Sequence, residues 1–406
     1  MPILLVIVDG MPDRPINGKT PLSVAKKPNM DKIAELGING IMDTIAPGIR
    51  PGSDTSHLAL LGYDPHKYYT GRGPFEAAGV GIDVKPGDVA FRVNFATVKG
   101  EGSIFDKVVV DRRAGRIENT EELIKAIKEE VKLPVEYELK RATGHRAAFV
   151  LRGVESHEVT DTDPKKIGAK VKVCKPLNDK ATKVAEIVNE FMQKAHEVLE
   201  RHPLNEEREK KGLPKANAIL LRGAGVVPKI ESFKDKFGLN LAVISATALI
   251  RGVGKMVGGK LIDVKGATGN RFTNIEAKVD SAIKALKDFD VVLLHFKATD
   301  ELGHDGDFNG KKEFIEKLDM YFSKFLELDY DEVCLIITSD HSTPVSVREH
   351  TADPVPVAIL NNSVRRDDVK IFSEFEAYKG GLCRIRGLDL LNIARDLLNL
   401  IEKFGA

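Results

Sequence analysis

Three apolar segments of this chain lead into acidic and imidazole side chains. The segments are 2–8, 291–296 and 333–338. The chemistry-bearing residues that follow them are Asp9, Asp300, His304, Asp340 and His341. Continuous apolar runs of this length are typical of buried parallel strands, and the carboxyl ends of such strands share one edge of a sheet. We therefore expect these five side chains to converge in one crevice.

A buried group of carboxylates and imidazoles is costly unless a cation lies among them. On a helix, Asp300 and His304 would share one face, although such a pair is also common on helix surfaces. Adjacent residues of an extended segment point to opposite sides, so Asp340 and His341 would bind two different ions, or a single ion if the backbone turns there. The alternative is that Asp340 only caps a turn at the end of the strand. His350 adds a third imidazole, although a lone loop histidine is more often a surface residue. Mixed oxygen and nitrogen donors suit Mn²⁺, Zn²⁺, Co²⁺ or Fe²⁺ better than Mg²⁺.

A nucleophile candidate, Ser53, follows Gly52 where a helix is expected to begin. A helix N-terminus stabilises a developing alkoxide and binds phosphate oxygens, and a nearby cation lowers the pKa of a hydroxyl. The alternative is that Ser53 is only the N-cap of the helix. In that case Thr55 and Ser56 are rival nucleophiles.

The elements that must position these residues alternate between strands and helices. The expected strands are 2–8, 218–221, 241–244, 291–296, 333–338 and 356–360, and the expected helices are 29–36, 55–61, 181–201 and 388–402. This alternation predicts an α/β fold whose mostly parallel sheet has helices on both faces. Between them, short strands and one helix (120–131) predict a smaller inserted α+β domain. We place this insertion at 80–180 and the discontinuous metal-binding catalytic domain at 1–79 and 181–406, with 201–214 as a charged loop.

Composition excludes several classes of function. The 61 basic and 60 acidic residues give a net charge of +1, which predicts no nucleic-acid or anionic-membrane partner. The three cysteines lack CxxC spacing, and the longest apolar stretch is shorter than the ~20 residues of a membrane span. We therefore expect a cytoplasmic protein. Abundant Lys and Glu, one Gln and no Trp resemble thermophile proteins. The glycines at 252–259 do not fit a phosphate-binding nucleotide loop, so no nucleotide is expected.

Five motifs, in order along the chain, resemble the alkaline phosphatase superfamily. They are VDGMPD (8–13), PGSDTSHL (51–58), DELGHDGD (300–307), SDHSTP (339–344) and HTADPVP (350–356). Within that superfamily, the pattern is most similar to the cofactor-independent phosphoglycerate mutases of archaeal type. The resemblance implies an alkaline-phosphatase-like fold whose inserted domain supplies substrate contacts.

The resemblance also implies a mechanism and its ligands. Ser53 would be phosphorylated during turnover at a site of two divalent ions, Mn²⁺ in preference to Zn²⁺, Co²⁺ or Mg²⁺. The implied ligand sets are Asp9, Ser53, Asp340 and His341 for one ion and Asp300, His304 and His350 for the other. The implied activity is interconversion of 3-phosphoglycerate and 2-phosphoglycerate, in glycolysis and gluconeogenesis, without 2,3-bisphosphoglycerate. The alternatives are another phosphomutase or phosphatase of the superfamily, or a non-catalytic protein that binds a phosphorylated metabolite.

Substrate contacts are expected from arginines, because the guanidinium fork binds phosphate and carboxylate in bidentate fashion. Two arginine-rich segments lie in the predicted insertion, and one further arginine follows the strand at 218–221. The candidates are Arg112, Arg116, Arg146 and Arg222, with His145 as a proton carrier. Lys297 is a candidate for neutralising phosphate charge. The alternative interpretation of each of these residues is a surface residue that is solvated or ion-paired and does not contact substrate. The expected partner is the small phosphoglycerate substrate, and a homo-oligomer is allowed but not indicated.

Overall fold

The protein divides into two compact units. The computed structural model describes residues 1–154 and 156–405. Unit 1 comprises Met1–Tyr68 and Ile230–Ala406, and unit 2 comprises Tyr69–Lys229. Each unit contains its own cluster of buried apolar side chains.

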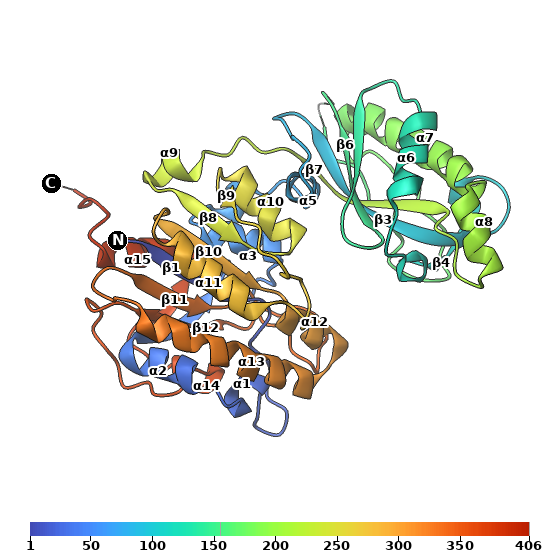
Figure 1. Cartoon of the computed structure of the whole chain (residues 1–406). Helices are drawn as coiled ribbons and strands as arrows, with labels where there is room; N and C mark the ends of the chain where they lie inside the picture. The colour runs from blue at the N-terminus through green and yellow to red at the C-terminus, as the bar shows by residue number, and fades with distance from the viewer. Residues whose placement is uncertain (155, 406) are drawn as a thin grey trace. The chain divides into compact units, whose positions relative to one another are not determined.

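Unit 1 is built on an eight-stranded mixed sheet with the order β13-β2-β12-β11-β1-β10-β8-β9 (Figure 1). Strands β11, β1, β10 and β8 are parallel neighbours, whereas β12 runs antiparallel to both β11 and β2. The strands are β1 (Ile3–Val8), β2 (Ile38–Asp43), β8 (Leu241–Ile244), β9 (Lys260–Leu261), β10 (Val291–Phe296), β11 (Cys334–Thr338), β12 (Val355–Leu360) and β13 (Cys383–Arg386). Because β11, β1 and β10 are adjacent and parallel, the residues that follow them meet at one edge of the sheet.

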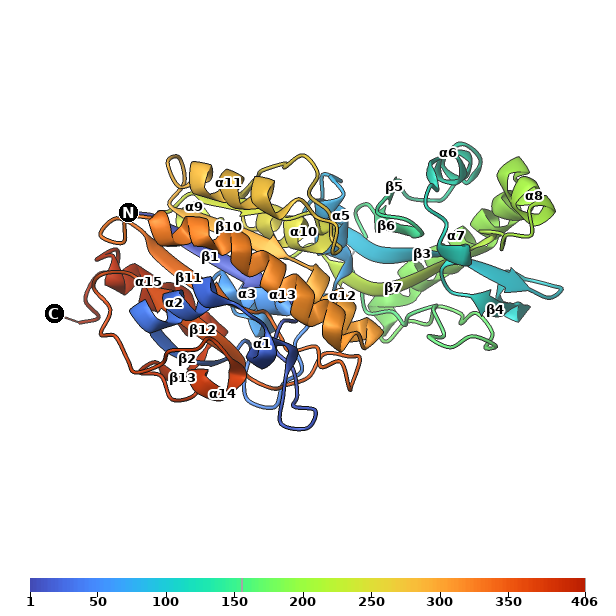
Figure 2. The same cartoon turned by 60° about the horizontal axis from the view of Figure 1, so that its bottom comes forward.

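Helices cover both faces of this sheet, so every residue of β1 is buried. Helices α2, α11 and α13 pack on one face, and α3, α10 and α15 form the layer on the other (Figures 1 and 2). The helices of unit 1 are α1 (Pro21–Val24), α2 (Pro28–Leu36), α3 (Ser53–Leu60), α4 (Pro65–Tyr68), α9 (Phe233–Phe237), α10 (Ala248–Met256), α11 (Ile275–Ala285), α12 (Ala298–Asp305), α13 (Phe308–Phe322), η4 (Ser323–Glu327), α14 (Glu374–Ala377) and α15 (Gly387–Leu397).

Unit 2 is built on a five-stranded antiparallel sheet. Its order is β4-β3-β6-β5, and β7 also pairs with β3. Side chains alternate along β3: Phe91 packs in the main core with helices α6 and α7, and Ala90 packs in the smaller cluster that includes Ala77 of α5. The elements are α5 (Gly73–Gly79), β3 (Val89–Lys99), η1 (Ile104–Asp106), β4 (Val108–Asp111), η2 (Ala114–Arg116), α6 (Glu121–Glu130), β5 (Tyr137–Arg141), β6 (Arg146–Leu151), η3 (Asp179–Ala181), α7 (Thr182–Glu200), α8 (Pro203–Lys210) and β7 (Ala218–Val226).

The predicted α/β class is confirmed, including the mostly parallel sheet and the second, smaller unit with its own sheet. The assignment of 181–229 to the catalytic domain is wrong. The strand at 218–221 belongs to β7, which pairs with β3 of unit 2, and α7 packs on the same sheet. The predicted insertion, residues 80–180, is therefore shorter at both ends than unit 2, which comprises Tyr69–Lys229. The stretch read as a charged loop contains α8, which is capped by His202 and begins with Pro203.

Among the described residues, no helix combines the length and the apolar character that crossing a bilayer requires.

Candidate functional site

The carboxyl ends of three neighbouring strands bring the predicted residues of unit 1 together. Asp9 directly follows β1, and Asp340 lies two residues beyond β11. Helix α12 begins just after β10 and carries Asp300 and His304 one turn apart. Sheet register, rather than closeness in sequence, therefore assembles this cluster.

The first group of possible metal ligands surrounds the Nε2 atom of His341. This atom lies 3.4 Å from Asp9 Oδ1, 3.3 Å from Asp340 Oδ2 and 3.1 Å from Ser53 Oγ. Asp9, Asp340 and His341 are each at most 1% exposed. All four residues predicted to bind one ion thus lie together, and their role as ligands stays a prediction.

Ser53 is the first residue of α3, and Gly52 is the N-cap. The Ser53 side chain therefore does not cap the helix, and its hydroxyl faces His341. The rival hydroxyls lie elsewhere. Thr55 Oγ1 donates to the carbonyl of Gly52, and Ser56 Oγ lies 3.4 Å from Thr44 Oγ1. The geometry favours Ser53 as the nucleophile.

The second group surrounds Asp300. Its Oδ1 atom lies 3.4 Å from the Nε2 atoms of both His304 and His350. The rings of His341 and His350 stack with centroids 3.6 Å apart, so the two groups adjoin. Glu349 belongs to a further group with His304 and His350, in which the ligand atoms lie within 4.8 Å of one another.

Each of these three histidines has its Nδ1 atom beside an oxygen. His304 Nδ1 lies 2.8 Å from the carbonyl of Arg348, and His350 Nδ1 lies 2.9 Å from that of Pro51. Thr343 Oγ1 donates to the Asp300 carboxylate, so it accepts from His341 Nδ1 at 3.1 Å. In the neutral ring, Nδ1 then carries the proton and the Nε2 lone pair faces the carboxylates, as in histidine metal sites.

Buried atoms without partners test whether the site fits a cation. Asp9 Oδ1 and Asp340 Oδ2 are buried and have no hydrogen-bond partner among the described residues. Nε2 of His57 is also buried without a partner among these residues, while its Nδ1 lies 2.6 Å from the carbonyl of Ser53. Native proteins rarely leave such atoms unsatisfied. Carboxylate and imidazole acceptors facing one another fit divalent transition-metal ions.

Lys297 supplies the positive charge of the protein itself at this site. Its Nζ atom lies 2.6 Å from Asp300 Oδ2 and 3.0 Å from Asp9 Oδ2. Burial alone would raise the pKa of both carboxyl groups, but Lys297 holds the pKa of each below its usual value. Burial and the charge of Asp9 raise the pKa of Asp340 well above its usual value. Burial opposes charge on His350, yet Asp300 raises its pKa to about 9. One lysine thus leaves the cluster short of positive charge.

A buried lysine on α13 ties together the loops that carry these ligands. Lys311 Nζ donates to Asp13 Oδ2 at 2.8 Å, to the carbonyl of Thr343 at 2.9 Å and to that of Pro12 at 3.3 Å. Asp13 also accepts from the N–H of Val345. Lys311 therefore joins the loop after β1 to the loop after β11.

Unit 2 contains a second concentration of charge. Arg92 of β3 and Arg222 of β7 are paired residues of adjacent strands. Like charges in this position are destabilising. Glu76 lies 3.8 Å from Nε of Arg92 and accepts from Nε of Arg72 at 2.9 Å. Five arginines with two acidic residues make up this arginine cluster, which consists of Arg72, Arg92, Arg112, Arg146, Arg222, Glu76 and Asp163.

The arginine cluster is under electrostatic strain. Burial, followed by the charges of neighbouring arginines, lowers the pKa of Arg92 to about 8. Burial also lowers the pKa of Arg222, although Asp163 opposes this shift. The Nε atoms of both are buried and, within the described part of the chain, have no hydrogen-bond partner. Inward-facing donors and excess positive charge fit an anionic ligand.

The predicted substrate-binding residues differ in where the structure places them. Arg112 forms a bidentate pair with Asp163, and Arg222 lies 3.9 Å from the same carboxylate. His145 adjoins Arg146, and burial together with that charge lowers its pKa to about 4. Arg116 is exposed at the end of η2 and is not among the residues of the arginine cluster. Arg222 was expected at the large sheet but lies in unit 2, because β7 pairs with β3.

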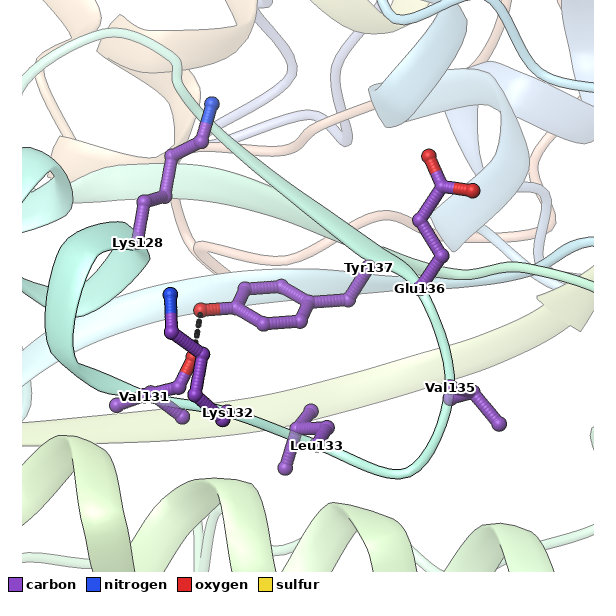
Figure 3. Close-up of a pocket in the computed structure, with 7 residues that line it drawn as sticks. All are labelled: Lys128, Val131, Lys132, Leu133, Val135, Glu136 and Tyr137. Carbon is purple, nitrogen blue, oxygen red and sulfur yellow. Dashed lines mark hydrogen bonds between the residues drawn. The ribbon is translucent and has the colours of Figure 1, made fainter.

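A surface pocket elsewhere in unit 2 does not share this chemistry. Figure 3 shows the Tyr137 ring in the pocket, with its hydroxyl bonded to the carbonyl of Val131. The lining residues are Lys128, Val131, Lys132, Leu133, Val135, Glu136 and Tyr137. None of the predicted site residues lines this pocket.

Several residues at these sites were missed by the sequence reasoning. His295 interrupts an otherwise apolar strand, and Arg92 lies between the buried Phe91 and Val93 of β3. Both positions are a usable signal, because strand interiors rarely carry such groups without a partner. His57 lies one helical turn after Ser53. Glu349 immediately precedes His350 and is exposed, and nothing in its sequence setting marks it.

Comparison with known proteins gives consistent matches. The family model of 2,3-bisphosphoglycerate-independent phosphoglycerate mutase matches residues 34–205. The chain is 72% identical to 2,3-bisphosphoglycerate-independent phosphoglycerate mutase 1 of Archaeoglobus fulgidus over 100% of both chains. It is 52% identical to the enzyme of the same name from Methanopyrus kandleri, over 100% of this chain and 98% of the other.

Solved structures agree. A protein from Pyrococcus horikoshii is 43% identical and superposes with a TM-score of 0.87, covering 100% of this chain and 99% of its own. A cofactor-independent phosphoglycerate mutase from Thermoplasma acidophilum is 34% identical with a TM-score of 0.70, covering 98% of this chain and 99% of its own.

Replacing Lys311 by Met should weaken the support of both ligand loops. The change leaves Asp13 buried without its charge partner, which costs about 3–5 kcal/mol of unfolding free energy. Denaturant unfolding followed by circular dichroism measures this loss, and titration with Mn²⁺ should show weaker binding. Lys27→Met is the matched control, since this buried lysine pairs with the partly exposed Asp31. Equal stability and Mn²⁺ binding in the two variants would contradict the assigned role of Lys311.

Proposed function

The chain belongs to the 2,3-bisphosphoglycerate-independent phosphoglycerate mutase family, and we propose that it transfers the phosphoryl group through a phosphoserine at Ser53. The observation that carries this proposal is the position of the Ser53 hydroxyl. It lies at the N-terminus of α3, 3.1 Å from His341 Nε2 and within a group of buried carboxylates. The reaction of the family interconverts 3-phosphoglycerate and 2-phosphoglycerate in glycolysis. We propose that this protein works in the cytoplasm.

Two divalent cations, preferably Mn²⁺, would be held by the two adjoining groups. Asp9, Ser53, Asp340 and His341 would hold one ion, and Asp300, His304 and His350 the other. When bound, such ions supply positive charge that lowers the pKa of a hydroxyl and neutralises phosphate oxygens. The unpartnered carboxylate oxygens and inward-facing Nε2 atoms support this assignment.

The serine exchanges the phosphoryl group with the two hydroxyls of glycerate. Ser53 Oγ forms a bond to phosphorus as the bond from phosphorus to O3 of 3-phosphoglycerate breaks, and the serine proton passes to the departing oxygen. The 2-hydroxyl of the retained glycerate then attacks the phosphoserine, and its proton returns to Ser53. The N-terminus of α3 stabilises the negative oxygens in both steps. Glycerate must be retained between the steps, because water would otherwise hydrolyse the phosphoserine.

Lys297 would contribute charge to the transferring phosphoryl group. Burial works against its ammonium, yet Asp300 and Asp9 raise its pKa, so it stays charged. Its side chain retains 19% of its exposed area, whereas the Asp9 carboxylate is fully buried. Lys297 is therefore both a fixed counter-charge for the two carboxylates and a cation within reach of a ligand.

The arginine cluster of unit 2 would bind the anionic groups of phosphoglycerate. An anion would relieve the repulsion between Arg92 and Arg222 and satisfy their unpartnered Nε donors. Arg112 and Arg146 would complete the site. Burial and Arg146 lower the pKa of His145 to about 4, so the ring is neutral at pH 7 and can accept a hydrogen bond from a substrate hydroxyl, although it is a weak base. Arg116 gains no support from the arrangement.

Metal-stripped protein should not convert 3-phosphoglycerate, and addition of Mn²⁺ should restore conversion to 2-phosphoglycerate without 2,3-bisphosphoglycerate. The reason is that the ligand carboxylates need a cation before a phosphate can approach them. Coupled assay for 2-phosphoglycerate measures the outcome. Metal-dependent release of free phosphate without isomerisation would favour a phosphatase instead, and unchanged activity after stripping would contradict the metal requirement.

Ser53→Ala should lower mutase activity to background, a loss of roughly 10⁶-fold on the scale of a removed nucleophile. Phosphoprotein should be detectable by mass spectrometry after substrate is added to the unaltered protein, and absent in the variant. Ser56→Ala is the matched control, because its buried hydroxyl points to Thr44. Mutase activity that persists in Ser53→Ala would remove Ser53 from the mechanism.

Arg92→Met should raise stability and lower activity together. Removing one of several crowded cations relieves repulsion, whereas the loss of a charged donor to substrate costs about 10- to 100-fold in kcat/KM. Thermal unfolding and steady-state kinetics measure the two effects. Arg152→Met is the control: this arginine pairs with Asp88 and Glu138, so its variant should lose stability and keep activity. Lower stability with unchanged kinetics in Arg92→Met would indicate a purely structural role.

A further inference from the structure

His295 is a buried histidine within the apolar strand β10, and both of its ring nitrogens have partners. Its Nε2 atom lies 2.9 Å from Asp9 Oδ2, and its Nδ1 atom lies 3.1 Å from Ser245 Oγ. Ser245 is itself 4% exposed and directly follows β8, the neighbour of β10. Adjacent strands thus align a hydroxyl, an imidazole and a carboxylate in one row.

The direction of the hydrogen bonds in this row is set by the Asp9 carboxylate, which Lys297 also contacts and which can only accept. The N–H of Thr247 donates to Ser245 Oγ at 3.1 Å. The serine oxygen can accept this bond and still donate its single proton to Nδ1 of His295. A neutral ring that accepts at Nδ1 carries its proton on Nε2 and donates it to Asp9 Oδ2.

The row of Ser245, His295 and Asp9 determines which carboxylate oxygen of Asp9 remains available to bind a cation. Oδ2 accepts from His295 and from Lys297. Oδ1 lies 3.4 Å from His341 Nε2 and has no hydrogen-bond partner within the described residues. One oxygen is therefore held by the protein, and the other is left to face the group of ligands.

Neighbouring groups hold the ring in place. Nζ of Lys278, on α11, donates to the carbonyl of His295 and lies 4.3 Å from the centre of the Phe296 ring. The ring of His57 meets that of His295 edge-on, with centroids 5.2 Å apart. Rotation of the imidazole would break the bonds at both of its nitrogens.

We propose that Ser245 and His295 form a positioning relay for Asp9, in which Ser245 holds the His295 ring at Nδ1 and His295, donating from Nε2, orients the carboxylate toward a cation. The inference rests on the proposed metal centre, but the tautomer itself does not require an ion. Outer hydrogen-bond partners of metal ligands commonly account for 10- to 100-fold in affinity. His295 is a positioning residue in this arrangement, because it acts through Asp9.

The tautomer is tested by long-range ¹H–¹⁵N spectra of ¹⁵N-labelled, metal-stripped protein. The signals of His295, one of ten histidines, are identified by their loss in His295→Gln. We expect a neutral ring protonated at Nε2, because the Asp9 carboxylate beside this atom can only accept. A ring protonated at Nδ1 in the unaltered protein would overturn the relay.

The effect on Asp9 is tested by calorimetric titration of the same metal-stripped proteins with Mn²⁺. His295→Leu should bind about 10- to 100-fold more weakly, whereas His295→Gln, whose amide can still donate to Asp9, should recover most of the affinity. His196→Leu is the control, since it removes a buried histidine that bonds the carbonyl of Asn217 in unit 2. Its affinity for Mn²⁺ should be unchanged.

The outcomes separate the relay from the proposed function. Unaltered affinity in His295→Leu, with normal binding by the parent protein, would overturn the relay alone. Failure of the parent protein to bind Mn²⁺ would overturn the metal centre of the proposed function. If His295→Leu does not fold, Ser245→Ala provides the same test with the imidazole retained, and an affinity equal to that of the parent would count against the relay.

Discussion

The structure of unit 1 depends on the cost of burying three carboxylates together. Asp9, Asp300 and Asp340 lie at the carboxyl edge of a sheet that is covered on both faces, where water cannot compensate their charge. Lys297 offsets part of this cost and keeps two of the three ionised, while the pKa of the third is raised. The surrounding hydroxyl, imidazole and lysine contacts organise the carboxylates without neutralising them. The fold thus leaves an excess of negative charge in this group of carboxylates.

The arginine cluster presents the same conflict with the opposite sign. Arg92 and Arg222 are opposed across two strands, and the acids beside the cluster, Glu76, Asp161 and Asp163, are fewer than its five arginines. Elsewhere in unit 2, Arg152 is fully paired with two acids, so the sheet does accommodate arginines at no such cost. The carboxylate group of unit 1 therefore lacks positive charge and the arginine cluster of unit 2 lacks negative charge, which suits the metal-dependent reaction on a phosphorylated acid that we propose.

The ligand cluster of unit 1 could be predicted from the sequence, because buried parallel strands are recognisable as continuous apolar segments and their carboxyl ends lie at the same edge of the sheet. Asp9, Asp300 and Asp340 could be found in this way without any structure. The partner sheet of a short strand could not be found, since the apolar run at 218–221 fits either sheet and only the pairing of β7 with β3 decides. That ambiguity misplaced Arg222. His295 in its apolar strand and Arg92 between apolar neighbours were visible as unusual residues. Their roles depend on contacts with Asp9 and Arg222, which lie far from them in the sequence.

The order of the strands has a consequence during synthesis. Strand β1 lies at the centre of the large sheet, and both of its neighbours, β10 and β11, come from the last third of the chain. Unit 2, by contrast, is one continuous segment that emerges well before them. A ribosome therefore releases an apolar strand with two open edges, then a compact unit with its own core, and only much later the strands that close those edges. Nascent-chain protection of β1 is thus a requirement that this topology imposes on the cell.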